Sequence, residues 1–270
     1  MPQAQPALQT PDQIPIQPSD CPPTRPSAQP GRHRSVTFSF FRYRPRWAPV
    51  AFTLMGFQRL VRGRDMPAGD VRLLGCGGQE GFSIVPDFNR YCLYYALDDP
   101  DEEALLKETR LWRFVAGPSV ETLHFRLRPA SGHGTWDGVE PYAYSREKVG
   151  ERPFVVLTHA RVHRSKARSF WRSVPRVREQ IRAATGCPYH IGFGEHPLLT
   201  LATFSVWTDL PAMRAFAYGG TEHHATNRAA RSEQWLTESL FARFEIERLS
   251  GDLAAYPALK ALTAAGRIPS

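Results

Sequence analysis

Two adjacent histidines, His223 and His224, are the residues whose type and setting most suggest chemistry in this chain. They lie near the expected start of a helix, beside a strongly apolar and aromatic part of the sequence, and an imidazole in such a setting can bind haem iron. Adjacent residues point in different directions on a helix, so at most one of the two would bind the iron. Arg228 and Arg231, one and two turns further on, could pair with carboxylates such as haem propionates. Capping or surface positions are the structural alternatives for all four residues.

A glycine-rich stretch at residues 75–81, GCGGQEG, has the composition of a phosphate-binding loop. A dinucleotide site needs such a turn to open a helix inside a parallel βαβ unit, whereas the next element expected here is a strand. We therefore predict a tight turn between strands. Gly192 and Gly194 echo Gly75 and Gly77, and missing side chains at these positions would leave room for a flat ligand.

The other histidines lack the spacing of a metal site. Zinc sites need Cys and His clusters at close spacing, or an HExxH motif on a helix, and the sequence contains neither. His159 and His163 are four residues apart at the end of an expected strand, and His190 and His196 flank a glycine turn. We predict structural or solvent-facing roles for these four. No serine or cysteine has the local pattern of a catalytic nucleophile.

The charge balance favours an anionic partner. The chain carries 34 basic and 26 acidic residues, a formal net charge of +8. The arginines are spread through every segment and no nucleic-acid-binding motif is found, so nucleic acid is not expected as a partner. An anionic lipid surface or an acidic electron donor fits this charge better.

Composition and cysteine spacing predict the compartment. A hydrophobic fraction of 42% and an aromatic fraction of 11% are typical of a globular protein. No apolar run approaches the roughly 18–20 residues of a membrane-spanning helix, and no secretory signal is found. The four cysteines lie far apart without a CxxC motif. We expect a cytoplasmic protein with free thiols.

The expected elements follow one another in two similar series. Residues 1–34 hold nine of the 24 prolines and few apolar side chains, which predicts a disordered tail. The first series is a strand at residues 36–43, a helix at 47–63, a strand that runs into the glycine-rich turn at 71–85, a strand at 90–97, a helix at 98–115 and a strand at 122–129.

The second series begins with a strand at residues 153–162. A helix at residues 165–184 follows, capped by Ser165 and interrupted at Pro175. Strands are expected at residues 187–197 and 198–209, helices at 210–219 and 221–239, and a last strand at 240–249.

The shared order predicts an internal duplication. Each half is expected to be a ferredoxin-like βαββαβ unit, so the fold class is α+β, with tandem duplicated units forming a dimeric-α+β-barrel-like arrangement within one chain. We expect a tail at residues 1–34, an N-terminal half at 35–130, a linker at 131–152, a C-terminal half at 153–250 and a C-terminal tail at 251–270.

Several short blocks resemble the spheroidene monooxygenase family of purple bacteria, the acyclic carotenoid 2-ketolases. The blocks are EGF, FWRSVP, GFGEHPLLTLATFSVW and WLTESLFARF, together with LMG and LPAMRAFA. They occur in order between residues 36 and 249. The GxGExP and FARF blocks are fairly specific, and the tail is not covered.

This resemblance implies an oxygenase that hydroxylates a carbon of an acyclic carotenoid such as spheroidene twice, leaving a ketone. It also implies haem b with its iron, molecular oxygen and a reduced ferredoxin. Counting back from Trp235 through the two arginines, the family's histidine falls on His223, with His224 as the alternative ligand. His196 and Thr200 depart from the family's pattern, which puts the end-group preference in doubt.

Two other functions stay open from the sequence. One is a non-catalytic protein of the same fold that binds a pigment or another hydrophobic ligand. The other is a cofactor-free monooxygenase. The resemblance also suggests a location peripheral to the inner (intracytoplasmic) membrane, with a membrane surface as a further partner.

Overall fold

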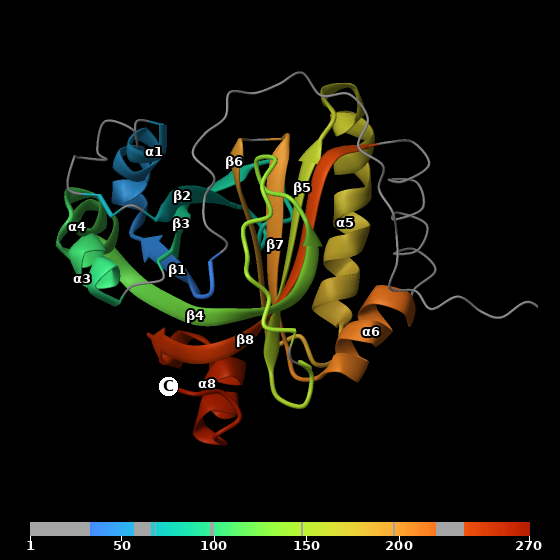
Figure 1. Cartoon of the computed structure of the whole chain (residues 1–270). Coiled ribbons are helices and arrows are strands. Elements are labelled where there is room, and N and C mark those ends of the chain that lie inside the picture. Colours follow the sequence, from blue (N-terminus) through green and yellow to red (C-terminus); the bar gives the residue numbers. More distant parts are fainter. Residues whose placement is uncertain are drawn as a thin grey trace, which may run out of the picture.

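The computed structural model describes residues 33–56, 66–67, 69–97, 100–146, 148–196, 198–219 and 235–270. Strands of these residues close into a barrel in the order β1-β3-β2-β6-β7-β5-β8-β4, and each neighbouring pair is antiparallel (Figure 1). The strands are β1 Val36–Tyr43, β2 Asp70–Gly77, β3 Pro86–Ala96, β4 Ser119–Gly134, β5 Phe154–Val162, β6 Tyr189–His196, β7 Thr200–Trp207 and β8 Leu236–Gly251.

The helices fall between the strands in the same order in both halves. The first half has η1 Pro45–Trp47 and α1 Ala48–Gly56 after β1, then α3 Pro100–Glu108 and α4 Arg110–Ala116 after β3. The second half has η2 Arg164–Lys166 and α5 Ala167–Ala183 after β5, then α6 Leu210–Gly219 after β7. The sheet orders β4-β1-β3-β2 and β8-β5-β7-β6 are equivalent. The predicted pair of ferredoxin-like units in one chain is confirmed.

The two halves join at two strand pairs, β4 with β8 and β2 with β6. At the second seam Gly75 pairs with Gly194, and the amide of Gly192 donates a hydrogen bond of 2.8 Å to the carbonyl of Glu80. A Cβ on Gly81, whose φ is +95°, would lie 1.9 Å from the nitrogen of Gly192. The glycine motifs therefore pack on each other, and at Gly192 the expected room for a flat ligand is filled by backbone.

Aromatic side chains fill the middle of the barrel. Phe38 is fully buried, and its ring centroid lies 5.1 Å from those of both Tyr94 and Phe204. Phe125 and Phe244 are also fully buried. Each buried ring contributes roughly 1.5–3 kcal/mol of hydrophobic stabilisation. The barrel interior is a packed core and not a channel.

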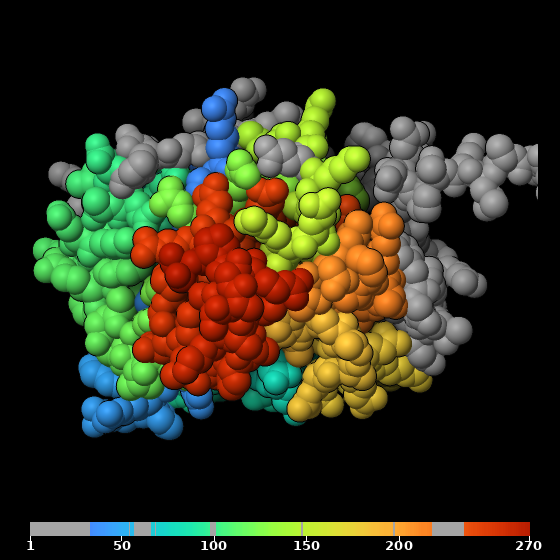
Figure 2. Space-filling model, turned by 90° about the horizontal axis from the view of Figure 1, so that it is seen from below, coloured from blue at the N-terminus to red at the C-terminus, as the bar shows by residue number. Residues whose placement is uncertain are grey.

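The C-terminal segment covers one end of this barrel. Residues 251–270 are predicted as a tail, but they contain η3 Leu253–Ala255 and α8 Pro257–Ala264. Leu259 and Ile268, exposed to 0% and 2%, belong to the same apolar cluster as the barrel interior. Figure 2 shows this segment spread over the lower end of the molecule.

Three predicted elements differ in extent. The helix expected at 98–115 is broken at Thr109, whose side chain accepts a hydrogen bond from the amide of Trp112 and caps α4. Strand β8 begins at Leu236, so residues 236–239, predicted to be helical, pair with β5 instead. Strand β4 continues to Gly134 and enters the predicted linker. The division of the chain into domains stays a prediction.

Helix α5 also differs from its expected form. It continues through Pro175, which is exposed. Ser165 lies in η2, and no side chain caps the first turn of α5, so the predicted cap is wrong. No helix of the described ranges combines the length and the apolar character needed to span a bilayer.

Candidate functional site

The residues predicted to bind a cofactor, His223, His224, Arg228 and Arg231, lie outside the described residues. The chain on either side of residues 220–234 is described. It leaves α6 at one end of α5 and returns at Trp235, which is 6% exposed and packs against Phe170 of α5 with ring centroids 6.4 Å apart. The carbonyl of Trp235 accepts a hydrogen bond of 2.8 Å from the amide of His163.

Between the end of α6 and Trp235 lies the outer face of the sheet of the second half, formed by β8, β5, β7 and β6, beneath α5 and α6 (Figure 1). Its lower part is sealed by an apolar cluster in which Trp207 and Phe216 have ring centroids 5.2 Å apart. The described residues do not seal its upper part, because Thr158 in the middle of β5 is exposed and its neighbours are partly exposed. We call this upper part the open sheet face: Thr158, Ala160, Leu201, Thr203, Ser239 and Phe241.

At the matching positions of the first half, the described side chains are buried. The corresponding outward positions Ser39 on β1 and Leu93 on β3 are both 0% exposed. In the second half, aromatic residues of α5 border the open sheet face instead. The indole nitrogen of Trp171 donates a hydrogen bond of 2.9 Å to the carbonyl of Leu198, in the β6–β7 connection. The open sheet face thus combines small side chains with an aromatic rim, a surface suited to a flat apolar group.

Other histidines near this face already have partners. Nε2 of His190 lies 3.2 Å from a carboxylate oxygen of Glu80, and burial lowers the pKa of His190. Nδ1 of His163 lies 2.7 Å from the hydroxyl of Ser165. Over the described ranges, no three His, Cys, Asp or Glu side chains come together as a metal site.

The remaining sequence candidates are structural. Ser205 is 5% exposed and accepts a hydrogen bond of 2.9 Å from the indole of Trp207. Burial raises the pKa of Cys187 to about 12, which keeps this thiol protonated. Thr200 is buried at the β6–β7 hairpin and pairs with His196, which is exposed.

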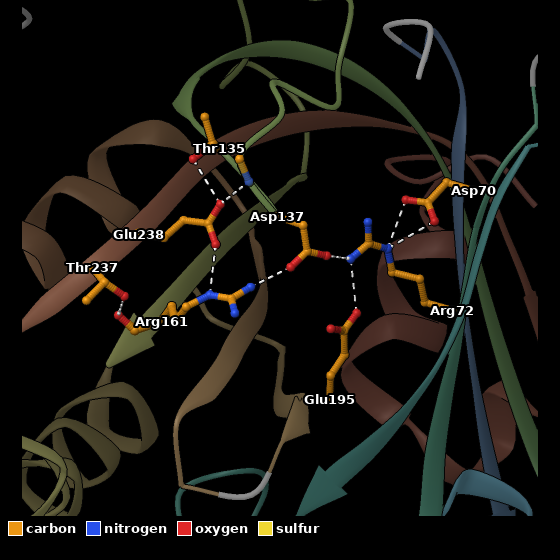
Figure 3. Close-up of polar contacts among 9 residues, drawn as sticks. Asp70, Arg72, Thr135, Asp137, Arg161, Glu195, Thr237 and Glu238 are labelled. Carbon is orange, nitrogen blue, oxygen red and sulfur yellow. Dashed lines mark hydrogen bonds and ion pairs between the residues drawn. The ribbon is translucent and has the colours of Figure 1, made fainter. Parts of the chain in front are cut away.

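A second group of polar residues, which sequence reasoning missed, lies at the end of the barrel where β8 begins (Figure 3). We call it the polar barrel end: Asp70, Arg72, Asp137, Arg161, Glu195 and Glu238. Arg72 donates to Asp70 at 2.9 Å, to Glu195 at 3.0 Å and to Asp137. Arg161 donates to Glu238 at 3.1 Å and to Asp137.

These charges come from both halves of the barrel, and Asp137 joins the two arginines. Burial alone would lower the pKa of Arg72, but the three carboxylates raise it, so this arginine stays charged. Burial alone would raise the pKa of Asp137, but Arg72 lowers it. The arrangement is a structural ion-pair network, because each arginine is paired with carboxylates. We call this network the clasp.

Below the clasp lies a stacked group of rings. The guanidinium of Arg72 lies 4.8 Å from the ring centroid of Trp136, and the ring of His159 stacks on Trp136 at 4.7 Å. His159 is 2% exposed, and neither ring nitrogen has a hydrogen-bond partner among the described residues. Burial lowers its pKa to about 4. At neutral pH His159 is thus a neutral aromatic side chain.

The chain is similar to three curated proteins named spheroidene monooxygenase. That of Rhodobacter capsulatus is 37% identical over 178 residues, which cover 65% of this chain and 74% of the relative. That of Cereibacter sphaeroides is 34% identical over 65% of this chain and 55% of the relative, and that of Rubrivivax gelatinosus is 32% identical over 73% and 77%. The chain belongs to the spheroidene monooxygenase family. A scan of the sequence against protein-family models gives no match.

Solved structures show weaker likeness. An aldoxime dehydratase is 11% identical with a TM-score of 0.48, covering 84% of this chain and 90% of that chain. A cofactor-independent oxygenase from Streptomyces nogalater is 18% identical with a TM-score of 0.31, covering 36% of this chain and 95% of that chain. The description of the fold therefore depends on the strand order of the chain itself.

Proposed function

We propose that the chain is a haem-dependent monooxygenase that introduces a keto group into an acyclic carotenoid such as spheroidene. The observation that carries this proposal is the 37% identity to a spheroidene monooxygenase over 74% of that relative. The substrate would be oxidised twice at one methylene. Each hydroxylation consumes one O2, two electrons and two protons and releases one water, and the resulting geminal diol loses a third water to become the ketone.

The open sheet face supports a place for the cofactor. Its small side chains and aromatic rim fit a flat porphyrin. The described part of the chain resumes at the border of this face, at Trp235. We propose that His223, or alternatively His224, would hold the iron of haem b, and that Arg228 and Arg231 would pair with its propionates. The haem would supply the activation of oxygen. The chain's own part is to exclude water with its aromatic rim.

The electrons would come from reduced ferredoxin. Helix α5, which borders this face, exposes Arg168 and Arg172 without ion pairs among the described residues, and basic side chains attract an acidic donor. We propose a cytoplasmic enzyme that works at the surface of the inner (intracytoplasmic) membrane, where a carotenoid is dissolved.

The visible spectrum of the purified protein tests the cofactor. We expect a Soret band that shifts on reduction, that disappears in His223→Ala and that persists in the control His196→Ala, since His196 is an exposed residue at the end of β6. Loss of the band in His224→Ala alone would assign the alternative ligand. A protein that binds no haem when supplied with it would refute the haem proposal.

Turnover separates the proposed enzyme from its alternatives. Detergent-solubilised spheroidene, oxygen and reduced ferredoxin should yield the keto product, and pigment extraction with chromatography measures it. Pigment binding without product would identify a binding protein. Product without a Soret band would identify a cofactor-free monooxygenase.

A further inference from the structure

The first half contains an apolar cavity that the proposed reaction does not use. It has a volume of about 390 Å³ and lies between the outer face of β1, β2 and β3 and the helices α1 and α4. Its walls include Ala51, Leu73, Tyr91 and Val115. Small-molecule pockets range from roughly 300 to 1,000 Å³, so this cavity could take one segment of a long hydrocarbon chain and not all of it.

Exposed aromatic side chains surround the cavity. Trp47 and Phe114 line its opening and are 37% and 52% exposed. Phe52 and Phe88, 51% and 40% exposed, extend the apolar surface, with their ring centroids 5.4 Å apart. Scattered single apolar residues are common on protein surfaces, but a group of exposed aromatic residues near an apolar cavity marks an interaction site.

Exposed arginines lie beside this group. Arg44, Arg46, Arg110 and Arg113 are all exposed, and none of them forms an ion pair among the described residues. No acidic residue occurs in η1, α1 or α4. We call the surface formed by these arginines and the four aromatic residues the α1–α4 face.

We propose that the α1–α4 face docks on an anionic lipid bilayer and that its cavity receives a hydrocarbon chain of that bilayer. Tryptophan and other aromatic side chains favour the level of the lipid headgroups, and arginine binds lipid phosphate. An acidic protein partner would match the arginines but would leave the aromatic rings and the cavity without complementary groups. The inference deepens the proposed function, since that function requires a substrate dissolved in lipid.

The position of this face agrees with the rest of the molecule. The helices of the first half lie on the side of the barrel opposite α5 and α6, as both overall views show (Figures 1 and 2). Docking through α1 and α4 therefore leaves the basic surface of α5 in water, open to an electron donor.

Flotation with lipid vesicles tests the docking without haem or carotenoid. The wild-type chain should float with phosphatidylcholine vesicles that contain phosphatidylglycerol, and binding should weaken as salt is raised. Phe52→Ser with Phe114→Ser should reduce partitioning at least tenfold, and Arg44→Ser with Arg46→Ser should reduce it about fivefold per arginine. The control Leu198→Ser removes an exposed apolar residue, 42% exposed, from the second half and should leave vesicle binding unchanged.

Fluorescence quenching by phospholipids with brominated acyl chains tests where the bilayer meets the protein. Quenching should be strong in the wild type and should fall by at least half in Trp47→Phe, although five other tryptophans remain. Equal flotation of all variants, or quenching unaffected by Trp47→Phe, would overturn the proposal. Self-association that the aromatic variants abolish, without any vesicle binding, would instead show that a second copy covers this face.

These results are independent of the proposed function. A protein that turns over detergent-solubilised carotenoid but does not float would refute the docking alone. A protein that floats but yields no product would refute the enzyme alone.

Discussion

At the scale of single residues, His159 shows how strongly the barrel interior controls chemistry. A buried imidazole without hydrogen-bond partners has no water to stabilise its charged form, so the neutral ring is favoured. Its stacking on Trp136 at 4.7 Å makes it part of the aromatic core. His159 is therefore expected to affect stability as a function of pH.

The free energy of unfolding should fall as the pH is lowered from 7 to 5. The pKa of His159 in the folded protein, about 4, lies below the roughly 6.5 of an unfolded histidine, so the unfolded chain takes up more protons over this range. The expected loss is about 1–2 kcal/mol from this residue. Urea unfolding at both pH values measures it, and His159→Phe should show a shallower pH dependence. An unchanged slope in that variant would contradict the assignment.

The residues of the polar barrel end could not be predicted from the sequence. In the strand DVRLLGCG, both faces carry apolar residues. The pattern therefore does not tell whether Arg72 points into the barrel or out of it. Arg72 turns out to share the inner face with Leu74 and Cys76. The histidine pair could be singled out only by type and resemblance, and its role stays a prediction.

At the scale of elements, the seam between β2 and β6 depends on residues without side chains. Gly192 lies so close to Gly81 that an added Cβ would be 2.7 Å from its carbonyl oxygen and 2.9 Å from its Cα. Both neighbouring atoms are backbone, so neither can turn aside. The two halves could not pair in this register with larger residues.

Gly192→Ala should therefore lower the free energy of unfolding by about 1–3 kcal/mol, the usual range for overpacking. Gly56→Ala is the matched control, since a Cβ there would meet nothing within 4 Å, and it should cause no loss. Denaturant unfolding of both variants makes the comparison. Equal stability of the two variants would show that the seam can relax.

Most strands follow from their alternating pattern, but their ends depend on partners. Residues 236–239 have the composition of a helix end, yet Leu236 pairs with Val162 and the strand starts there. Pairing with a neighbouring strand outweighs local propensity, which is worth less than about 1 kcal/mol per residue. In the same way, the break between α3 and α4 follows from the buried Thr109, which gave no clear signal in the sequence.

At the scale of the whole molecule, the clasp of Arg72 and Arg161 joins strands of both halves. Strands β2, β5, β6 and β8 each contribute a charged side chain to it. The duplicated fold could be predicted because the order of elements repeats. The clasp could not, because it exists only after the two halves have met.

Removing one cation from the clasp should destabilise the barrel. Arg72→Met leaves Asp70, Asp137 and Glu195 without their shared partner and should cost about 1–3 kcal/mol, less than a fully buried pair because the Arg72 side chain is 18% exposed. Arg182→Met is the control: this side chain is 61% exposed, with one ion pair of 3.7 Å to Glu80, and its loss should cost below about 0.5 kcal/mol. Thermal unfolding that does not distinguish the two variants would argue against a structural clasp.

The difference between the outer faces of the two sheets has an evolutionary consequence. In a barrel built from two identical subunits, every mutation is inherited by both sides, so the faces must stay alike. Here one gene encodes both halves, and a change in one is not copied to the other. The outer faces of the two halves can therefore differ, and a single barrel can hold a pocket on each side with different tasks.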